Sequence, residues 1–331
     1  MQLSLENTRA AFQRLAPGIL ASFTIAIAAS FLGEHYSAPV MLYALLLGMA
    51  FHFLHQDGRC VAGIDITAKS VLRIAVGLLG AQITLAQIMS YGLWLPLLVI
   101  CGVLLTIGFG LLAARAAGLP GPFGLLTGGA VAICGASAAL AISSVLPRSE
   151  TSERDTVFTV VGVTALSTVA MIVYPLITTW LGWDDVAAGI FLGATIHDVA
   201  QVVGAGFSIS EPAGQAATFT KLLRVMLLVP VVLSLALVFR KGSGAGAKPP
   251  FFLVAFVVLV ALNSLGVIPA PALDAMKQIS RWFLVAAIAA LGMKTSLKAL
   301  AQVGGRAVAL IVAETVFLAV LAGAALYLLG H

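Results

Sequence analysis

Charged residues are scarce in this sequence, and their scarcity excludes the most common class of protein. Of 331 residues only 9% are Asp, Glu, Lys or Arg, whereas a soluble globular domain carries about 25%. Hydrophobic residues make up 61% of the chain, in runs broken only by short polar stretches. No stretch leaves room for a separate soluble domain of about 100 residues. We therefore predict one membrane domain over residues 1–331 and not a soluble enzyme.

Cysteines are also few. Cys60, Cys101 and Cys134 are too scattered for a disulfide framework or a thiolate metal site, so we expect no metal and no cofactor. The formal charge of +5 would suit a nucleic-acid partner. However, the basic residues occur singly in loops, which is typical of orientation signals in membrane proteins. We therefore expect this chain to be embedded in a lipid bilayer and to bind no nucleic acid.

The hydrophobic runs predict an all-α polytopic membrane protein. A helix needs about 20 mostly apolar residues to cross a bilayer, and this criterion gives about 11 transmembrane helices. The predicted spans lie near residues 17–33, 39–55, 68–88, 92–114, 122–147, 156–181, 187–207, 215–240, 250–268, 278–294 and 306–330.

The distribution of basic residues between the spans predicts a cytoplasmic N-terminus. On this topology the inner segments hold most of the basic residues, namely Arg9, Arg14, Arg59, Lys69, Arg115, Arg240, Lys241, Lys248, Lys294, Lys298 and Arg306. The outer side keeps Arg148, Arg154, Lys277 and Arg281, with Lys221 and Arg224 near a helix end.

An internal repeat is a frequent feature of secondary carriers, which are often built from two inverted halves. A shift of 151 residues superimposes Leu72-Arg73-Ile74 on Leu223-Arg224-Val225 and lays spans two to six onto spans seven to eleven. A rival shift of 212 leaves the fifth span without a partner. We therefore predict repeat one over about 39–181 and repeat two over about 187–330, with an extra N-terminal helix at 17–33.

Glycines concentrate in the fifth span, where Gly128, Gly129 and Gly135 lie in mid-membrane. Such glycines let a helix break or let it pack closely. If the helix unwinds around Cys134 and Gly135, the half-helix beginning at Ala136-Ser137 presents free backbone N–H groups and a positive dipole end. This would be an anion site. The alternative is a continuous helix whose small residues only pack tightly.

Ionisable side chains in the seventh span form the second candidate feature. His197, Asp198 and Gln201 lie within about one turn, and such groups are costly in a membrane unless they are paired or face water. His197 and Gln201 share a helix face, and histidine titrates near neutral pH, which suits coupling to protons or other ions. The alternative is that these side chains satisfy neighbouring helices.

Basic and acidic groups in later spans complete the candidates. Lys221 and Arg224 share a helix face and would contact an anion, although snorkelling to head groups is an alternative. Arg73 occupies the equivalent position under the shift of 151. Glu314 would be buried in the last span, paired with a basic group.

Three motifs carry a resemblance to a known family. They are Ala-Ile-Cys-Gly-Ala-Ser-Ala at 132–138, Gly-Ala-Thr-Ile-His-Asp-Val-Ala-Gln-Val-Val-Gly-Ala-Gly at 193–206 and Thr-Lys-Leu-Leu-Arg-Val at 220–225. Over most of its length the chain resembles the YeiH-type sulfate exporters of bacteria. It is similar in turn to the cation-proton antiporter and bile-acid symporter fold group.

The resemblance implies inverted five-helix repeats with two broken, crossing helices, which would be the fifth and tenth spans. The tenth span, around Leu291-Gly292-Met293-Lys294, departs from the pattern because it has no glycine cluster. The implied location is the bacterial inner membrane, and analogy with related folds suggests a homodimer.

These features predict a secondary transporter of a small anion, sulfate or a related sulfur oxyanion or sulfonate, working by alternating access. Cys134, Gly135, Ala136, Ser137, Lys221 and Arg224 would bind the substrate, and His197, Asp198 and Gln201 would couple its movement to an ion. One rival is a passive anion channel. Another is a membrane-embedded enzyme using Cys134 or His197, although no clustered nucleophile, base and orienting group is apparent.

Overall fold

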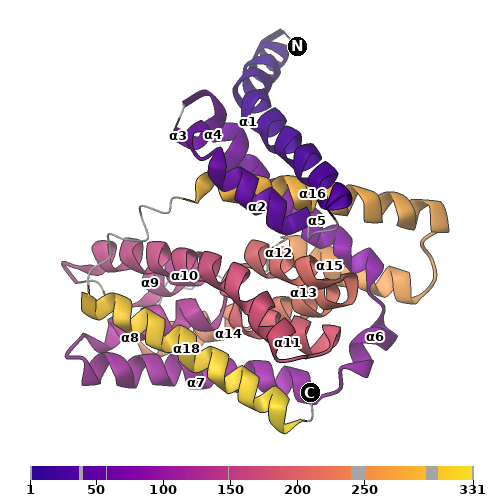
Figure 1. Cartoon of the computed structure of the whole chain (residues 1–331). Coiled ribbons are helices and arrows are strands. Elements are labelled where there is room, and N and C mark those ends of the chain that lie inside the picture. Colours follow the sequence, from indigo (N-terminus) through magenta and orange to yellow (C-terminus); the bar gives the residue numbers. More distant parts are fainter. Residues whose placement is uncertain are drawn as a thin grey trace. The chain divides into compact units, whose positions relative to one another are not determined.

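The computed structural model describes residues 2–36, 40–56, 58–147, 149–239, 251–295 and 305–329. Within these ranges all regular secondary structure is helical, which confirms the all-α part of the predicted fold class. The chain forms two compact units (Figure 1). Unit 1 comprises Met1–Ile88 and Phe251–Leu297, and unit 2 comprises Met89–Pro250 and Lys298–His331. The prediction of a single domain with two repeats stays a prediction.

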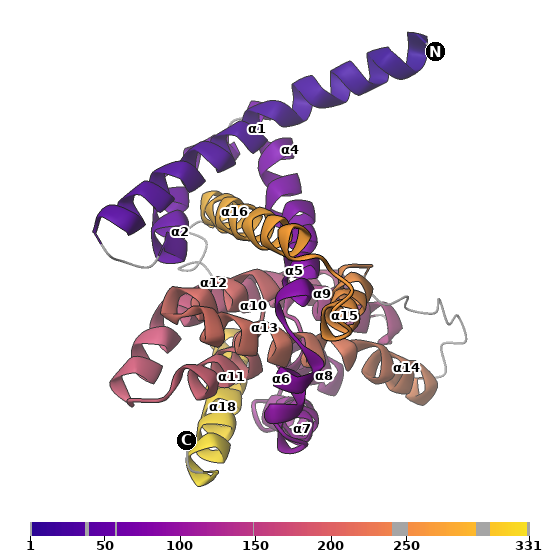
Figure 2. The same cartoon turned by 90° about the vertical axis from the view of Figure 1, so that its right-hand side faces the viewer.

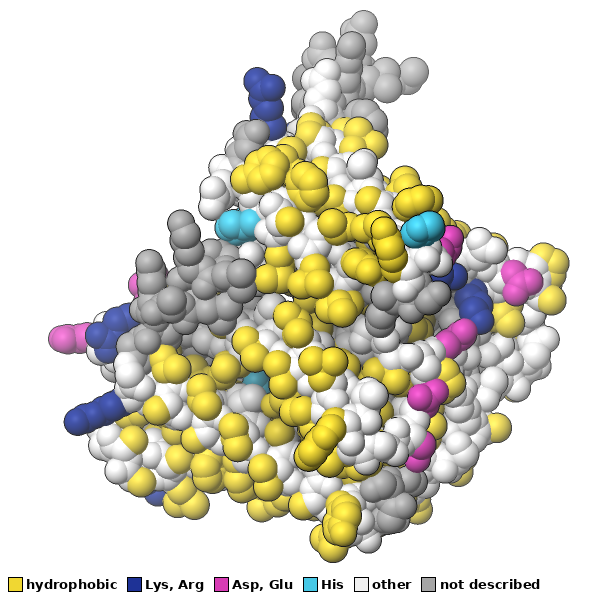
Figure 3. Space-filling view, in the orientation of Figure 1, with side chains coloured by type: hydrophobic (Ala, Val, Ile, Leu, Met, Phe, Trp, Pro, Cys, Tyr) yellow, Lys and Arg dark blue, Asp and Glu magenta, His cyan; other side chains and the backbone are white. Residues whose placement is uncertain are grey.

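Five helical segments among the described residues are long and apolar enough to cross a membrane. They are Gln13–His35, Trp94–Ala116, Ser152–Trp180, Glu211–Val238 and Gly305–Leu328. Large hydrophobic side chains on several helices also face outward, as Leu112 and Leu237 do with exposed fractions of 65% and 79%. On the face of unit 2 visible in Figure 3, hydrophobic side chains spread widely and charged ones lie mainly at the margins. This pattern suits a lipid solvent.

Some residues on which the orientation prediction rests, namely Arg148, Arg240, Lys241, Lys248 and Lys298, lie outside the described residues. The cytoplasmic N-terminus therefore stays a prediction.

Unit 1 is held together by close approaches between helices at glycines. A Cβ on Gly18 of α1 would collide with the Cys60 carbonyl in α4, and one on Gly48 of α2 would collide with the Ala289 carbonyl in α16. Small residues allow helices to approach this closely in membranes. The described helical elements of unit 1 are α1 (Gln2–His35), α2 (Val40–Ala50), α3 (Phe53–Gln56), α4 (Gly58–Ile66), η1 (Thr67–Val71), α5 (Leu72–Leu79), η2 (Gly80–Gln82), α15 (Phe251–Ser264) and α16 (Ala270–Lys294), and α6 (Leu85–Ser90) carries the chain into unit 2.

The prediction of a break in the tenth span is wrong, because α16 is one continuous helix from Ala270 to Lys294. Its glycine, Gly292, serves close packing: a Cβ there would collide with the carbonyl of Leu45 in α2. The helix ends instead at a polar cluster. His52 Nδ1 lies 2.7 Å from the Met293 carbonyl oxygen, and Lys294 Nζ lies 2.6 Å from Asp65.

Unit 2 contains two pairs of short helices in which the chain is interrupted partway, α8 with α9 and α11 with α12 (Figure 2). Neither member of a pair reaches the roughly 20 residues that a span needs. The described helices of unit 2 are α7 (Trp94–Ala116), α8 (Gly121–Ala132), α9 (Ala136–Val145), α10 (Ser152–Trp180), α11 (Asp185–Thr195), α12 (Val199–Ile209), α13 (Glu211–Met226), α14 (Leu228–Val238) and α18 (Gly305–Leu328).

Helix α13 packs closely on both halves of the second pair. On α11, a Cβ at Gly189 or Gly193 would collide with the carbonyl oxygen of Ala213 or Ala217 of α13. On α12, a Cβ at Gly206 would lie 2.9 Å from the Ala217 side chain. These glycines bring the α13 backbone against α11, so long side chains one turn further along α13 can reach the end of α11.

Candidate functional site

The first interruption lies where the sequence predicts it. Helix α8 ends at Ala132, the chain turns through Ile133, Cys134 and Gly135, and α9 begins at Ala136. Gly135 has φ +63° and ψ −124°, a conformation that residues with a Cβ rarely adopt. The predicted break around Cys134 and Gly135 is therefore confirmed, and a continuous helix is excluded.

The second interruption lies in the seventh predicted span. Helix α11 ends at Thr195, and Ile196 and Asp198 have extended backbone angles before α12 begins at Val199. The Asp198 carboxylate accepts a hydrogen bond of 2.8 Å from the Ala200 backbone N–H, so Asp198 is the N-cap of α12. This break was not predicted, because residues 187–207 were expected to form one span with His197 and Gln201 on one helix face. An Asp before an apolar run is the signal that could have located the start of α12. The two interruptions do not occupy equivalent positions under the shift of 151.

The two interruptions are in direct contact inside unit 2. A Cβ on Gly135 would lie 3.5 Å from the Cβ of His197. Lys221 of α13 connects them further, because its Nζ donates hydrogen bonds to the carbonyl oxygens of Ile133 at 2.7 Å and Ile196 at 3.0 Å. These carbonyls lie just after the ends of α8 and α11, where helices leave carbonyls without intrahelical partners. A single ammonium group thus joins the two breaks.

Arg224, one turn after Lys221, donates to four carbonyl oxygens at the same helix ends, of which the Ile196 oxygen is shared with Lys221. Its Nε donates to the Ala132 carbonyl at 2.8 Å and its Nη2 to that of Val131 at 2.7 Å. Its Nη1 lies 3.1 Å from the Gly193 oxygen and 3.0 Å from the Ile196 oxygen. Both cations are essentially inaccessible to solvent. They lie at the negative ends of two helix dipoles, where positive charge is stabilised, and they do not snorkel.

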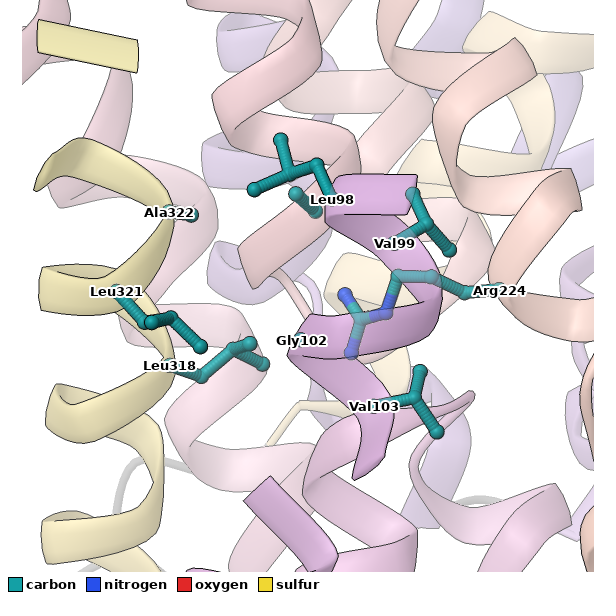
Figure 4. Close-up of a pocket in the computed structure, with 9 residues that line it drawn as sticks. Leu98, Val99, Gly102, Val103, Arg224, Leu318, Leu321 and Ala322 are labelled. Atoms are coloured by element: carbon teal, nitrogen blue, oxygen red, sulfur yellow. The ribbon is translucent and has the colours of Figure 1, made fainter. Parts of the chain in front are cut away.

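A small pocket reaches the Arg224 guanidinium from one side. Apart from Arg224 it is lined by apolar residues of α7 and α18, together with Ala194. Figure 4 shows the guanidinium reaching toward α7, beside Gly102. Arg224 is thus enclosed by backbone carbonyls and by an apolar wall.

The N-terminal ends of the second halves differ from each other. Helix α12 has Asp198 as its cap, whereas α9 begins after Gly135 and receives no hydrogen bond from a capping side chain. Cys134 and Gly135 are buried, Ala136 is half-buried and the side chain of Ser137 is exposed. The open N–H groups of α9 are therefore next to an accessible surface of unit 2.

The charged side chains at the breaks do not cancel. Lys221 and Arg224 contribute two positive charges and Asp198 contributes one negative charge, which leaves one positive charge. The helix dipoles add two positive N-terminal ends and two negative C-terminal ends, which offset each other. The side chains around the breaks therefore give this region a net positive charge.

His197 and Gln201 are buried and each keeps one polar atom free of hydrogen bonds among the described residues. The Thr315 hydroxyl donates its hydrogen to the Ile311 carbonyl at 2.8 Å, so His197 Nε2, 3.0 Å from that hydroxyl, is the donor in their contact. Gln201 Nε2 donates to the Thr168 hydroxyl at 2.9 Å. His197 Nδ1 and Gln201 Oε1 have no partner, and buried polar atoms of this kind are uncommon. The structure thus brings all nine predicted site residues into or beside the two breaks.

Two comparisons with known proteins place the chain in a family. A family model described as conserved hypothetical protein 698 matches residues 17–311. A UPF0324 membrane protein of Chlorobaculum tepidum is 56% identical over 317 residues, covering 94% of this chain and 88% of the relative. The chain belongs to this family. Another member, the UPF0324 membrane protein TauZ of Paracoccus denitrificans, is 52% identical over 331 residues, covering 98% of both chains.

A third UPF0324 relative, from Rhizobium meliloti, is 55% identical over 322 residues, covering 95% of this chain and 93% of the relative. Membership of the UPF0324 family, together with the five long apolar helices, makes the chain a multi-pass membrane protein with bacterial relatives.

Proposed function

We propose that this UPF0324 protein is a secondary transporter that moves a small anion across the bacterial inner membrane. The observation that carries the proposal is the uncapped N-terminus of α9, which lies at an accessible surface beside two buried cations. Helix N-termini bind anions through backbone N–H groups and the dipole. In transporters, such ends occur at interrupted helices near the bilayer midplane.

A sulfur oxyanion or a small sulfonate suits this site best. Its oxygens would accept hydrogen bonds from the backbone around Cys134, Gly135 and Ala136 and from the Ser137 hydroxyl. Lys221 and Arg224 would contribute mainly through their charge, because most of their hydrogens are already engaged by carbonyls. The resemblance to the YeiH-type sulfate exporters favours sulfate itself.

The second break would couple anion movement to a proton or another ion. His197, Asp198 and Gln201 surround it, and two of them hold buried polar atoms without partners, which a change of conformation or an ion could satisfy. In this proposal the chain has eleven spans, a cytoplasmic N-terminus and a homodimeric assembly, and it works by alternating access around the breaks.

Two rival functions differ in what they require. A passive anion channel would need no coupling, so accumulation against a gradient excludes it. A membrane-embedded enzyme would need an activated nucleophile beside a base and an orienting group. The His197 nitrogen bound to Thr315 and the buried position of Cys134 do not favour that arrangement.

Uptake into proteoliposomes tests the proposal. Labelled sulfate, sulfite and a small sulfonate are supplied with and without an imposed pH gradient. We expect one of these anions to accumulate above its outside concentration when the gradient is present. Equilibration without accumulation would favour the channel. No protein-dependent flux of any of the three would remove the sulfur-anion assignment.

A further inference from the structure

Glu314 is a buried carboxyl group that the site described above does not use. It lies in the middle of α18, and its side chain is fully buried within unit 2. Among the described residues no Lys, Arg or His forms an ion pair with it, contrary to the prediction of a basic partner. Its one hydrogen bond is to the hydroxyl of Thr127 in α8, at 2.7 Å from Oε1. Oε2 has no partner.

An ionised carboxylate is costly in such surroundings. Burying an unpaired charge in an apolar region costs far more than one hydrogen bond returns. A proton on Oε2 removes the charge and so most of this cost, and it leaves a neutral O–H whose hydrogen has no acceptor among the described residues. The charged groups of the helices packed on α18 lie in terminal turns: Arg115 in α7, Glu153, Arg154 and Asp155 in α10, and Asp185 in α11. Helix α8 has none, and His197 meets α18 at Thr315.

The neighbouring residues make room for a carboxyl that changes its charge. A Cβ on Gly110 of α7 would lie 2.6 Å from Oε1, so only glycine leaves this space open. The Thr127 hydroxyl also lies 3.1 Å from the Phe123 carbonyl oxygen, and its single hydrogen can serve either acceptor. When Glu314 is ionised, the Thr127 hydroxyl donates its hydrogen bond to the carboxylate. When Glu314 is protonated, the hydroxyl can donate to the Phe123 carbonyl oxygen instead.

Helix α18 also links Glu314 to the second break. The next residue, Thr315, accepts the hydrogen bond from His197, and His197 directly precedes the cap of α12. One turn further, Leu318 lines the pocket that reaches Arg224 (Figure 4). A shift of α18 on charging or neutralising Glu314 would therefore act on both breaks.

We propose that Glu314 is the residue that binds and releases the coupling proton during transport. This inference rests on the proposed transport function and names its proton site. Glu314 takes a proton from water in one conformation and returns it to water in the other, and α18 transmits the change to His197 through Thr315.

Infrared titration of the reconstituted protein tests this proposal without needing a substrate. We expect a carbonyl-stretch band of a protonated carboxylic acid that disappears in Glu314→Gln and shifts in Thr127→Val, which removes its hydrogen bond. Glu153→Gln, a change at an exposed carboxyl, serves as the control and should leave the band unchanged. If Glu314→Gln does not fold, the shift in Thr127→Val carries the assignment. Absence of any such band over the pH range overturns the proposal.

Transport then separates this proposal from the proposed function. Glu314→Gln should exchange the anion across the membrane but lose stimulation by a pH gradient. Undiminished stimulation in this variant overturns the role of Glu314 and leaves an anion transporter. If the wild type moves no anion, the proposed function fails and the coupling role falls with it, whereas the infrared band still reports whether Glu314 holds a proton.

Discussion

Lys221→Ala is expected to lower the free energy of unfolding by about 3–5 kcal/mol, because it removes two buried hydrogen bonds from a charged group. The substitution leaves the Ile133 carbonyl oxygen without its donor and removes one of the two donors to the Ile196 oxygen, which keeps its hydrogen bond from Arg224. Each hydrogen bond to a charged group contributes about 1.5–3 kcal/mol. Thermal unfolding in detergent should show a marked fall in midpoint, with poor recovery of folded protein from membranes.

The matched control is Lys69→Ala, which removes an exposed lysine from unit 1. Its midpoint should stay close to that of the wild type, because exposed charges contribute little. A second comparison uses Arg224→Lys against Arg73→Lys. Only Arg224→Lys should lower the thermal midpoint, because a lysine cannot reproduce the four hydrogen bonds that the planar guanidinium makes. If Lys221→Ala unfolds like the wild type, the two cations do not hold the breaks together.

Ser137→Asp is expected to reduce anion transport at least tenfold without lowering stability. A carboxylate here occupies the first turn of α9, which has no side-chain cap. It would repel a bound anion by about 4 kcal/mol at 4 Å with an effective dielectric constant near 20. The same carboxylate stabilises the helix N-terminus by about 0.3–1 kcal/mol. Both quantities are measured on the same preparation. The uptake rate should fall, while the thermal midpoint should stay the same or rise slightly.

Two variants control this result. Ser137→Asn has similar size without charge and should retain most transport. Ser144→Asp places the same charge on an exposed residue near the far end of α9 and should leave anion affinity nearly unchanged. Equal uptake by Ser137→Asp and the wild type would show that the anion does not bind at the start of α9.

The fifth and tenth predicted spans differ in how far the sequence predicts a break in each. Around Cys134 the glycines and small residues indicated the break, and Gly135 has the left-handed φ that only glycine adopts easily. In the tenth span a break was expected only from the family resemblance, and that span has no glycine cluster around Gly292. There, however, glycine permits contact with α2, and the helix continues. The glycine cluster therefore indicated the real break, whereas the resemblance alone predicted a break that the structure does not have.

The partners of the buried charges lay beyond sequence reasoning for a different reason. Lys221 and Arg224 were recognised as a shared basic face, but the carbonyls they bind belong to segments 25 to 93 residues away. Backbone carbonyls at a helix end carry no residue-type signal. The predicted ionic partner of Glu314 was wrong because the structure provides a threonine hydroxyl in place of a cation.

Counterflow measures the central claim most directly, because only a carrier that alternates between two sides can show it. Proteoliposomes loaded with a high concentration of unlabelled anion are diluted into a trace of labelled anion, with no pH gradient. The proposed mechanism predicts a transient accumulation of label inside above its outside concentration, which then decays. A monotonic rise to equal concentrations for an anion that the protein transports would contradict alternating access and favour a channel.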